Sequence, residues 1–297
     1  MATIPRFASA SYLAVKHQVD RFDRWPAWQK VRRGFQAPIF QFADTGWLGL
    51  TPLKTHILIC GFPAAGTTLL QLMLENGLPG ARRFGKERSG WKAATYSFRN
   101  HSIMISKQPR DIFRLAPLRE FYQARPAELR VILMQRDPRD LLTAQRKRGD
   151  SLEYCGSAKD WKGYYIYFLK QREAADSLIV RYEDLVTNVA AEQQRVEAFL
   201  QMKMSVPFEQ CNSVVREDFD TTTLCGVRAV ETSRVARWRE PSHKQRITQM
   251  LLELPDLPEA VRQLGYESDD AWTQPFLSAA VSHDSIMESA PSNSLRA

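Results

Sequence analysis

The stretch "THILICGFPAAGTTLLQLMLEN" (Thr55–Asn76) is the most informative about the fold, because it joins an apolar run to a helical pattern through a loop with two glycines. Residues 55–60 are apolar and rich in β-branched side chains, which predicts a short buried strand. Residues 68–76 have the pattern of a helix that ends near Gly77. Open α/β sheets bind ligands beyond the carboxyl ends of their strands, so this loop is expected to bind a ligand.

The composition of the loop indicates that the ligand is an anion. Gly61 and Gly66 allow the backbone to turn and to approach the anion closely. The amides of residues 64–68 and the hydroxyls of Thr67 and Thr68 can donate hydrogen bonds to it, aided by the helix dipole. Thr67 stands where nucleoside-triphosphate loops carry a lysine. A second interpretation is that Gly-Thr-Thr only begins a helix.

The rest of the chain continues the same alternation of strand and helix. Further buried strands are expected at 102–106, 130–135 and 177–182, and helices near 111–123, 140–148, 158–175 and 190–201. This order predicts an α/β protein with a central parallel sheet flanked by helices.

Three parts are expected along the chain. Residues 54–276 form the α/β domain, and residues 277–297, rich in serine and alanine, form a disordered tail. Residues 1–53 are basic and aromatic, which suits a peripheral membrane contact or a segment packed on the core. The unclear amphipathic pattern favours packing on the core.

The charge and the cysteines narrow the class of protein. The 297 residues carry a formal charge of +8, which suits an anionic partner such as a nucleotide, although many soluble proteins are basic. The aromatic residues form no stacking motif, so no nucleic-acid partner is expected. The four cysteines show neither CxxC spacing nor a metal pattern, and with no secretory signal or long apolar run the chain is expected to be cytoplasmic.

Three more motifs stand at or after the expected strands. "RDPRD" begins with Arg136, whose guanidinium at the carboxyl edge of the sheet suits a phosphate or carboxylate, and its Asp140 is expected to cap the following helix. "VRYEDL" carries Tyr182, which suits base stacking or core packing. "TSRVARWRE" places Arg237 and two further arginines around Trp238.

Together with the loop, and in this order over about residues 55–240, these motifs resemble the sulfotransferase family. The resemblance implies a P-loop-NTPase-like sulfotransferase fold. It also implies a donor, 3′-phosphoadenosine 5′-phosphosulfate (PAPS), with no metal, and an acceptor hydroxyl on a glycan, lipid or small metabolite. The residues implied to bind the donor are Pro63, Ala64, Ala65, Gly66, Thr67, Thr68, Arg136, Tyr182 and Arg237.

The sequence departs from the family pattern at two positions. Ala64 replaces the lysine or arginine of the family loop, and losing one such donor at a transfer site costs roughly 3–4 kcal/mol of transition-state stabilisation. Ala144 replaces a serine of the 3′-phosphate motif, although Thr143 is adjacent, at a cost of roughly 1–3 kcal/mol. Either another cation, Lys107 or Arg237, covers the loop, or the protein is a weakened or non-catalytic member.

Glu87 is the leading candidate for the catalytic base. Many relatives place a histidine soon after the second strand, but none follows Lys107 here, whereas "GKERSGW" resembles the lysine–glutamate pair of carbohydrate-type relatives. Lys107 or Lys86 would then supply positive charge to the leaving oxygen, and His101 is a third candidate for the base. The alternative function is a P-loop kinase or NTP hydrolase. The sequence does not disclose the acceptor or the oligomeric state.

Overall fold

The computed structural model describes residues 38–39, 42, 44–46, 49–95, 100–148, 151–211 and 230–277. The chain divides into two compact units. The first combines residues 1–136 with 159–232, and the second combines residues 137–158 with 233–297. Most of the expected N-terminal extension and nearly all of the expected tail lie outside the described residues, so the boundaries at 53/54 and 276/277 stay predictions.

The first unit contains a parallel sheet with strand order β2-β1-β3-β6. Its strands are β1 (Thr55–Gly61), β2 (Ile103–Lys107), β3 (Glu128–Gln135) and β6 (Ser177–Arg181). β1 is buried along its whole length, without alternation, as expected for a central strand covered on both faces. The predicted α/β class with a central parallel sheet is therefore confirmed. Both ends of every predicted strand of this sheet lie within two residues of the observed ends.

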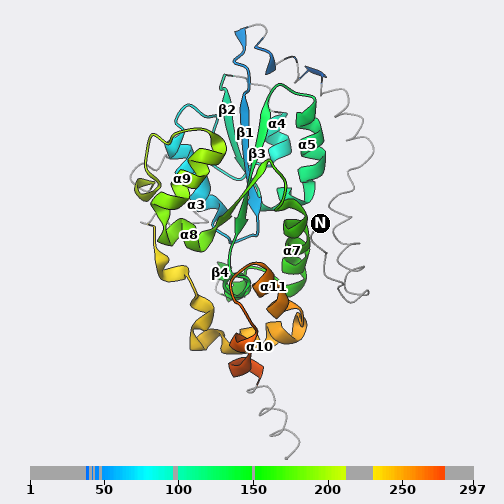
Figure 1. Cartoon of the computed structure of the whole chain (residues 1–297), viewed down its shortest axis with the longest axis vertical. Helices are drawn as coiled ribbons and strands as arrows, with labels where there is room; N and C mark the ends of the chain where they lie inside the picture. Colours follow the sequence, from blue (N-terminus) through cyan, green and yellow to red (C-terminus); the bar gives the residue numbers. More distant parts are fainter. Residues whose placement is uncertain are drawn as a thin grey trace, which may run out of the picture. The chain divides into compact units, whose positions relative to one another are not determined.

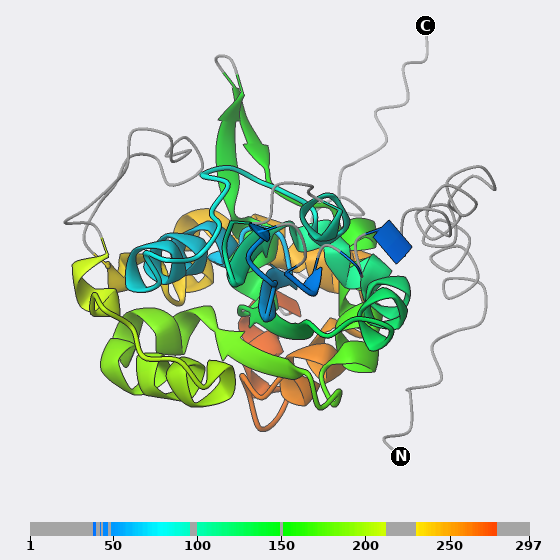
Figure 2. The ribbon, with the colours of Figure 1, turned by 90° about the horizontal axis from the view of Figure 1, so that it is seen from above.

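Helices cover both faces of this sheet (Figures 1 and 2). On one side lie α3 (Thr67–Gly77), α8 (Tyr182–Thr187) and α9 (Val189–Leu200), followed by the short η3 (Phe208–Gln210). On the other side lie α4 (Gly90–Ala94), α5 (Leu115–Gln123) and α7 (Ala158–Gln171). The short helix η2 (Pro109–Arg114) leads from β2 into α5, so the helix expected at 111–123 is a 3₁₀ turn followed by an α-helix.

An aromatic cluster fixes the residue at which β1 becomes the loop. Phe62 is fully buried, with its ring centroid 5.2 Å from that of Phe168 and 6.2 Å from that of Trp161. Burying a side chain of this size stabilises the fold by about 1.5–3 kcal/mol. The loop therefore starts from a rigid base.

A buried polar chain lies on the α5 side of β1. His56 Nδ1 is 2.6 Å from the Tyr122 hydroxyl, and His56 Nε2 is 2.7 Å from Ser106 Oγ. The Arg125 guanidinium lies over the Tyr122 ring and forms a buried ion pair with Asp44. These contacts satisfy polar groups that would be costly to bury alone, and they attach Asp44 to the first unit.

The second unit is built from short elements. In chain order they are α6 (Pro138–Thr143), β4 (Gln145–Arg148), β5 (Ser151–Tyr154), η6 (Arg237–Arg239), η7 (Pro241–His243), α10 (Lys244–Glu253), α11 (Leu257–Gln263) and η8 (Ala271–Thr273). η5 (Thr232–Arg234) stands where the chain passes from the first unit to the second. β4 and β5 form an antiparallel pair.

The helix expected at 140–148 is wrong beyond Thr143. Ala144 leaves the helix in an extended conformation (φ −61°, ψ 128°), and Gln145–Arg148 pairs with β5 instead. The Cys155 amide donates to the Ala144 carbonyl at 2.8 Å, which closes the end of this pairing. The helix propensity of the sequence is thus overridden by strand pairing, since propensities amount to less than about 1 kcal/mol per residue.

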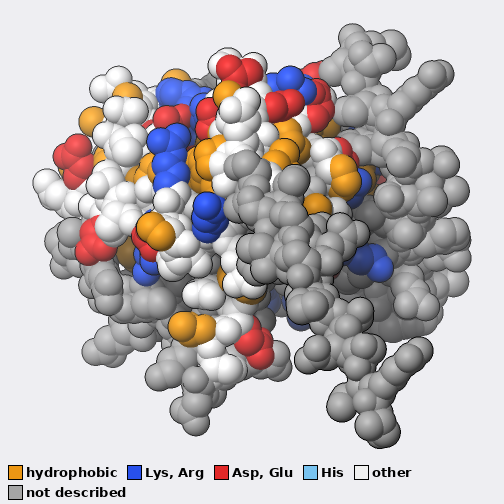
Figure 3. Space-filling model, turned by 90° about the horizontal axis from the view of Figure 1, so that it is seen from below, with side chains coloured by type: hydrophobic (Ala, Val, Ile, Leu, Met, Phe, Trp, Pro, Cys, Tyr) orange, Lys and Arg blue, Asp and Glu red, His pale blue; other side chains and the backbone are white. Residues whose placement is uncertain are grey.

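The described part of the chain offers no candidate for a membrane span or for a metal cluster. No helix in the described ranges is long and apolar enough to cross a membrane. Within the same ranges, no group of three or more His, Cys, Asp or Glu residues is arranged to hold a metal ion. On the face drawn in Figure 3, the described basic side chains lie among acidic and apolar ones.

Candidate active site

The loop after β1 can begin only with a glycine. Gly61 has φ +127°, and a Cβ atom there would lie 2.4 Å from the Met134 carbonyl oxygen. The Phe62 amide donates to that same carbonyl at 3.2 Å, and the Ala65 amide donates to the Phe62 carbonyl at 3.3 Å. The loop therefore turns tightly against β3 rather than extending into solvent.

The tip of the loop is exposed and has an unusual backbone conformation. Pro63 and Ala64 are exposed, whereas Ala65 is fully buried. Ala64 has φ +62°, in the left-handed region that costs a residue with a Cβ atom roughly 1–2 kcal/mol. Backbone strain of this kind gathers at ligand clamps, and here it turns the peptide groups on either side of Ala64.

The helix after the loop starts without a side-chain cap. Gly66, with φ +84°, is the N-cap residue of α3, and no side chain accepts a hydrogen bond there. The first bond within the helix runs from the Leu70 amide to the Gly66 carbonyl at 3.1 Å. Amides in the first turn of an α-helix point outward along the helix axis, and together with the helix dipole they create a site suited to an anion. Thr67 is buried at this turn, and Thr68 is half-buried.

Arg136 and Tyr182 lie against the loop. Arg136 follows β3 directly, as predicted, and its Nη1 donates to the Ala64 carbonyl at 3.0 Å. Its guanidinium lies over the Tyr182 ring, 4.4 Å from the centroid. A Cβ atom at Gly66 would lie 2.6 Å from Tyr182 Cδ2, so the ring also packs on the start of α3. Tyr182 was expected to be the last residue of a strand, but it is the first residue of α8.

Lys107 and Glu87 form an ion pair beside β2. Lys107 is the last residue of the strand and is 5% exposed, and its Nζ is 3.8 Å from Glu87 Oε1. The Glu87 side chain is half exposed. The structure thus brings the two predicted catalytic residues together, with the carboxylate on the solvent side. His101, the third candidate for the base, has its Nδ1 3.2 Å from the Gly80 carbonyl oxygen instead.

Backbone bonds and one buried carboxylate hold the segment that carries Glu87. The Arg88 amide donates to the Lys107 carbonyl at 2.9 Å, and the Gly90 amide donates to Asp111 Oδ2 at 2.6 Å. Burial raises the pKa of Asp111 to about 6, against the opposing effects of the Gly90 bond and of Arg114. Asp111 is 2% exposed, which suits an anchor for the segment better than a group that contacts substrate.

Tyr164 is a further buried titratable group near Glu87. Burial raises the pKa of Tyr164 to about 12, while the charge of Arg110 and its hydrogen bond act in the opposite direction. The negative charge of Glu87 also contributes to raising the pKa. Neither Asp111 nor Tyr164 was predicted from the sequence; the only signal for Asp111 was its place four residues after Lys107, past the end of a strand.

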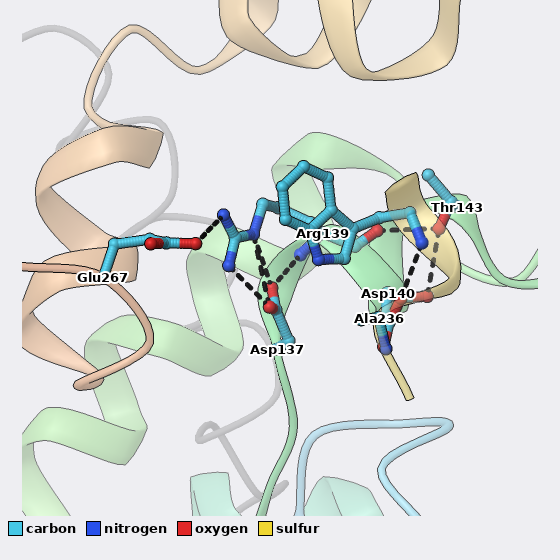
Figure 4. A network of polar contacts seen from close by, with 7 residues as sticks. Asp137, Arg139, Asp140, Thr143, Ala236 and Glu267 are labelled. Carbon is cyan, nitrogen blue, oxygen red and sulfur yellow. Dashed lines mark hydrogen bonds and ion pairs between the residues drawn. The ribbon is translucent and has the colours of Figure 1, made fainter. Parts of the chain in front are cut away.

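The second unit contains a closed ionic network built on the same "RDPRD" motif (Figure 4). Arg139 Nη2 is 2.8 Å from Asp137 Oδ2, and its Nη1 is 2.6 Å from Glu267 Oε1. The guanidinium lies 3.8 Å from the ring centroid of Trp238 and 4.7 Å from that of Trp272. Burial disfavours the charged guanidinium, but the bonds to Asp137 and Glu267 outweigh it and raise the pKa of Arg139.

The expected capping role of Asp140 is wrong. Asp137 caps α6 by accepting the Arg139 amide at 2.9 Å. The two carboxylate oxygens of Asp140 instead accept the amides of Ala236 and Trp238, each at 2.9 Å (Figure 4). Sequence reasoning missed this contact because the two segments are about a hundred residues apart in the chain.

Two further residues of the predicted donor site, Arg237 and Thr143, lie in the second unit. The Arg237 side chain is half exposed, and its Nε is 2.9 Å from Glu240 Oε1. The Thr143 hydroxyl, next to Ala144, donates to the Arg139 carbonyl at 2.8 Å. Their roles toward a donor therefore stay predictions.

Two sulfotransferase domains are among the solved structures that are similar to this chain. The sulfotransferase domain from the Synechococcus PCC 7002 olefin synthase is 15% identical with a TM-score of 0.45, over 68% of this chain and 95% of that domain. The sulfotransferase domain from the curacin biosynthetic pathway is 13% identical with a TM-score of 0.42, over 68% and 98%. No family model and no curated protein matches the sequence. The function proposed below therefore rests on the residues of the loop and its surroundings.

Proposed function

We propose that this protein is a sulfotransferase that moves a sulfuryl group from PAPS to the hydroxyl of a glycan, lipid or small metabolite. One observation carries the proposal: α3 begins, without a side-chain cap, beyond the carboxyl edge of a parallel sheet, under a loop to which Arg136 is hydrogen-bonded. Amides, a helix dipole and a guanidinium thus converge where an anionic donor would bind.

The fit to the 5′-phosphosulfate rests on the glycines. The left-handed N-cap residue Gly66 leaves the first-turn amides without a side chain over them, and Gly61 lets the loop start against β3. Tyr182 beside Gly66 would bound this subsite, and Arg237 remains the proposed contribution of the basic C-terminal segment. The residues that would surround the anion are Pro63, Ala64, Ala65, Gly66, Thr67 and Thr68.

The Glu87–Lys107 pair supports the chemistry. The oxygen of the acceptor hydroxyl forms the new O–S bond, the bond from sulfur to the 5′-phosphate oxygen breaks, and adenosine 3′,5′-bisphosphate leaves. The hydroxyl proton goes to the Glu87 carboxylate, which is half exposed and so accessible to an acceptor. Lys107 orients Glu87 and adds positive charge beside the developing negative charge of the leaving group.

A P-loop kinase or NTP hydrolase fits the residues less well. Thr67 stands at the position of the loop lysine. β3 ends at Gln135 and is followed by Arg136, so an arginine stands where a metal-binding acid is expected in those enzymes. The Asp137 carboxylate that follows is hydrogen-bonded to Arg139.

The second candidate is a weakened or non-catalytic member that binds the nucleotide. One observation favours it, because the exposed loop residue Ala64 carries no charge. It keeps the nucleotide site of the main proposal and removes only the transfer step.

A calorimetric comparison of nucleotides tests the proposal. We expect adenosine 3′,5′-bisphosphate to bind without magnesium and more tightly than ATP, because the loop lacks the lysine that suits a triphosphate. Single-turnover sulfate transfer from labelled PAPS to a panel of hydroxyl acceptors then separates the two candidates. Preference for magnesium ATP would contradict both, and tight bisphosphate binding without any transfer would favour the second.

A further inference from the structure

Two hydrogen bonds from the backbone hold the segment that carries Glu87. The Arg88 amide donates to the Lys107 carbonyl at 2.9 Å. The Gly90 amide donates to Asp111 Oδ2 at 2.6 Å. The contact between Glu87 Oε1 and Lys107 Nζ, at 3.8 Å, is an ion pair that is longer than a hydrogen bond. The position of the half-exposed Glu87 carboxylate therefore depends on the backbone that carries it.

Asp111 is fixed to the central strands of the sheet. It lies in η2, four residues after the end of β2, and it is 2% exposed. Its amide donates to the Gln108 carbonyl at 3.0 Å, and the Gln108 amide donates to the Ile59 carbonyl of β1 at 3.1 Å. The carboxyl that accepts the Gly90 amide is thus held from the core, and it gives the segment of Glu87 a fixed point of attachment.

The charge state of Asp111 changes the strength of this attachment. Burial raises the pKa of Asp111 to about 6 and the charge of Glu87 also raises it, whereas the Gly90 bond and the charge of Arg114 lower it. A hydrogen bond that lowers the pKa of a carboxyl is stronger when the carboxyl is ionised. Cys60 on β1 also lies within electrostatic range of Asp111, but burial raises the pKa of its thiol, which stays neutral.

We propose that Asp111 is a positioning residue for Glu87: its carboxyl fixes the segment of the catalytic base through the Gly90 amide, and it does so more firmly when it is ionised. The part that concerns catalysis rests on the proposed function, whereas the attachment itself does not. Ionisation costs stability because burial disfavours the charged form, and it strengthens the bond that positions the base. Turnover should therefore rise as the pH rises through about 6, while the contribution of Asp111 to stability falls over the same range.

The first test measures turnover and the Michaelis constant for PAPS as a function of pH, with decanol, naphthol and methyl glucoside as acceptors. Asp111→Asn keeps an acceptor for the Gly90 amide but stays neutral, so it imitates the protonated form. We expect its turnover to be within about threefold of wild type at about pH 5 and about tenfold lower at about pH 8, the range for exchanging a charge-assisted hydrogen bond for a neutral one. The Michaelis constant for PAPS should change by less than about twofold, because Asp111 lies outside the loop after β1.

The second test observes the Gly90 amide without any turnover. Gly90 is the only glycine of the chain that directly follows a serine, so cell-free synthesis of the full chain with ¹³C-carbonyl serine and ¹⁵N-glycine selects its amide signal in an NMR spectrum. In wild type this signal should move with a midpoint near pH 6 as Asp111 ionises, and in Asp111→Asn it should not. If Asp111→Asn does not fold, wild type decides alone, since the midpoint of the amide signal and that of turnover must coincide.

A control variant and the possible outcomes separate this role of Asp111 from the proposed function. Glu209→Gln, which removes an exposed carboxylate from η3, controls for net charge and should follow wild type in both tests. A rise in turnover near pH 6 that persists in Asp111→Asn, or a wild-type Gly90 amide that does not titrate there, would overturn the positioning role and leave the proposed function standing. Binding of adenosine 3′,5′-bisphosphate without transfer would overturn the catalytic part. Absence of bisphosphate binding, together with a titrating Gly90 amide, would overturn the proposed function and support the proton-linked attachment.

Discussion

The two arginines of the "RDPRD" motif, Arg136 and Arg139, lie in regions built for different purposes. Arg139 lies in the second unit between two tryptophan rings and contacts two carboxylates, Asp137 and Glu267. Arg136 lies in the first unit and donates to a neutral carbonyl at the exposed tip of a strained loop. One guanidinium is enclosed by carboxylates and aromatic rings, and the other contacts the tip of the loop after β1.

This difference shows how a structural charge is told from a functional one. A guanidinium with two carboxylate partners and an aromatic ring on each side has a structural role, because its partners depend on it to compensate their burial. A carboxylate that stays half exposed, such as that of Glu87, is accessible to a ligand. Three predictions test this contrast.

The largest expected effect is on the second unit. Arg139→Gln should lower the free energy of unfolding by about 3–5 kcal/mol, because it leaves Asp137 and Glu267 without the charge that compensates their burial. Urea unfolding of the variant and of wild type measures the difference. A loss below about 1 kcal/mol would mean that this buried network contributes no more to stability than a surface salt bridge does.

The next prediction concerns the buried anchor of the first unit. The pKa of Asp111 is raised from 3.8 to about 6 in the fold, so its stabilising contribution is fully present below pH 3.8 and is lost as the pH rises through about 6. Asp111→Asn keeps an acceptor for the Gly90 amide but cannot ionise. Between about pH 4 and about pH 8 the wild type should therefore lose about 3 kcal/mol of unfolding free energy that the variant keeps.

Urea unfolding at both pH values measures the effect on Asp111. Glu209→Gln, an exposed carboxylate in η3, is the matched control and should follow wild type at both pH values. A pH-independent difference between Asp111→Asn and wild type would mean that the carboxyl titrates alike in the folded and unfolded chains.

The third prediction concerns Glu87, where we expect the smallest change in free energy but one that is specific to turnover. Glu87→Gln should lower turnover about a hundredfold or more, which is about 2.7 kcal/mol, the usual effect of losing a general base. It should leave bisphosphate affinity unchanged and cost less than about 1 kcal/mol of stability, since the carboxylate paired with Lys107 is half exposed. Single-turnover transfer, calorimetry and urea unfolding measure the three quantities.

Glu267→Gln is the control that completes the contrast. It removes a carboxylate from Arg139 in the second unit, so it should cost stability and leave turnover near wild type. Retained turnover in Glu87→Gln would move the base elsewhere, to His101 first.

Most of the fold could be predicted from the sequence, because each strand and loop carries its own local pattern of residues. Buried strands of a parallel sheet are continuous apolar runs, as in Thr55–Gly61, and the glycines of the loop mark positions where a side chain would clash. The pairing of β4 with β5 could not be predicted, because strand pairing there outweighs a helical pattern.

The amino-acid sequence alone specifies the α/β class, the place of the loop and the residue types that an anion site needs, because these follow from periodicity and from backbone conformations that only glycine adopts freely. The partner of each charge emerges only when the chain is folded. Folding brings Lys107 to Glu87 and Arg136 to Ala64, and it joins Asp140 to the backbone of a distant segment. Contacts between residues far apart in the chain decide which charged groups are paired, because the electrostatic energy of a charge depends on the groups that the fold places within a few ångströms of it.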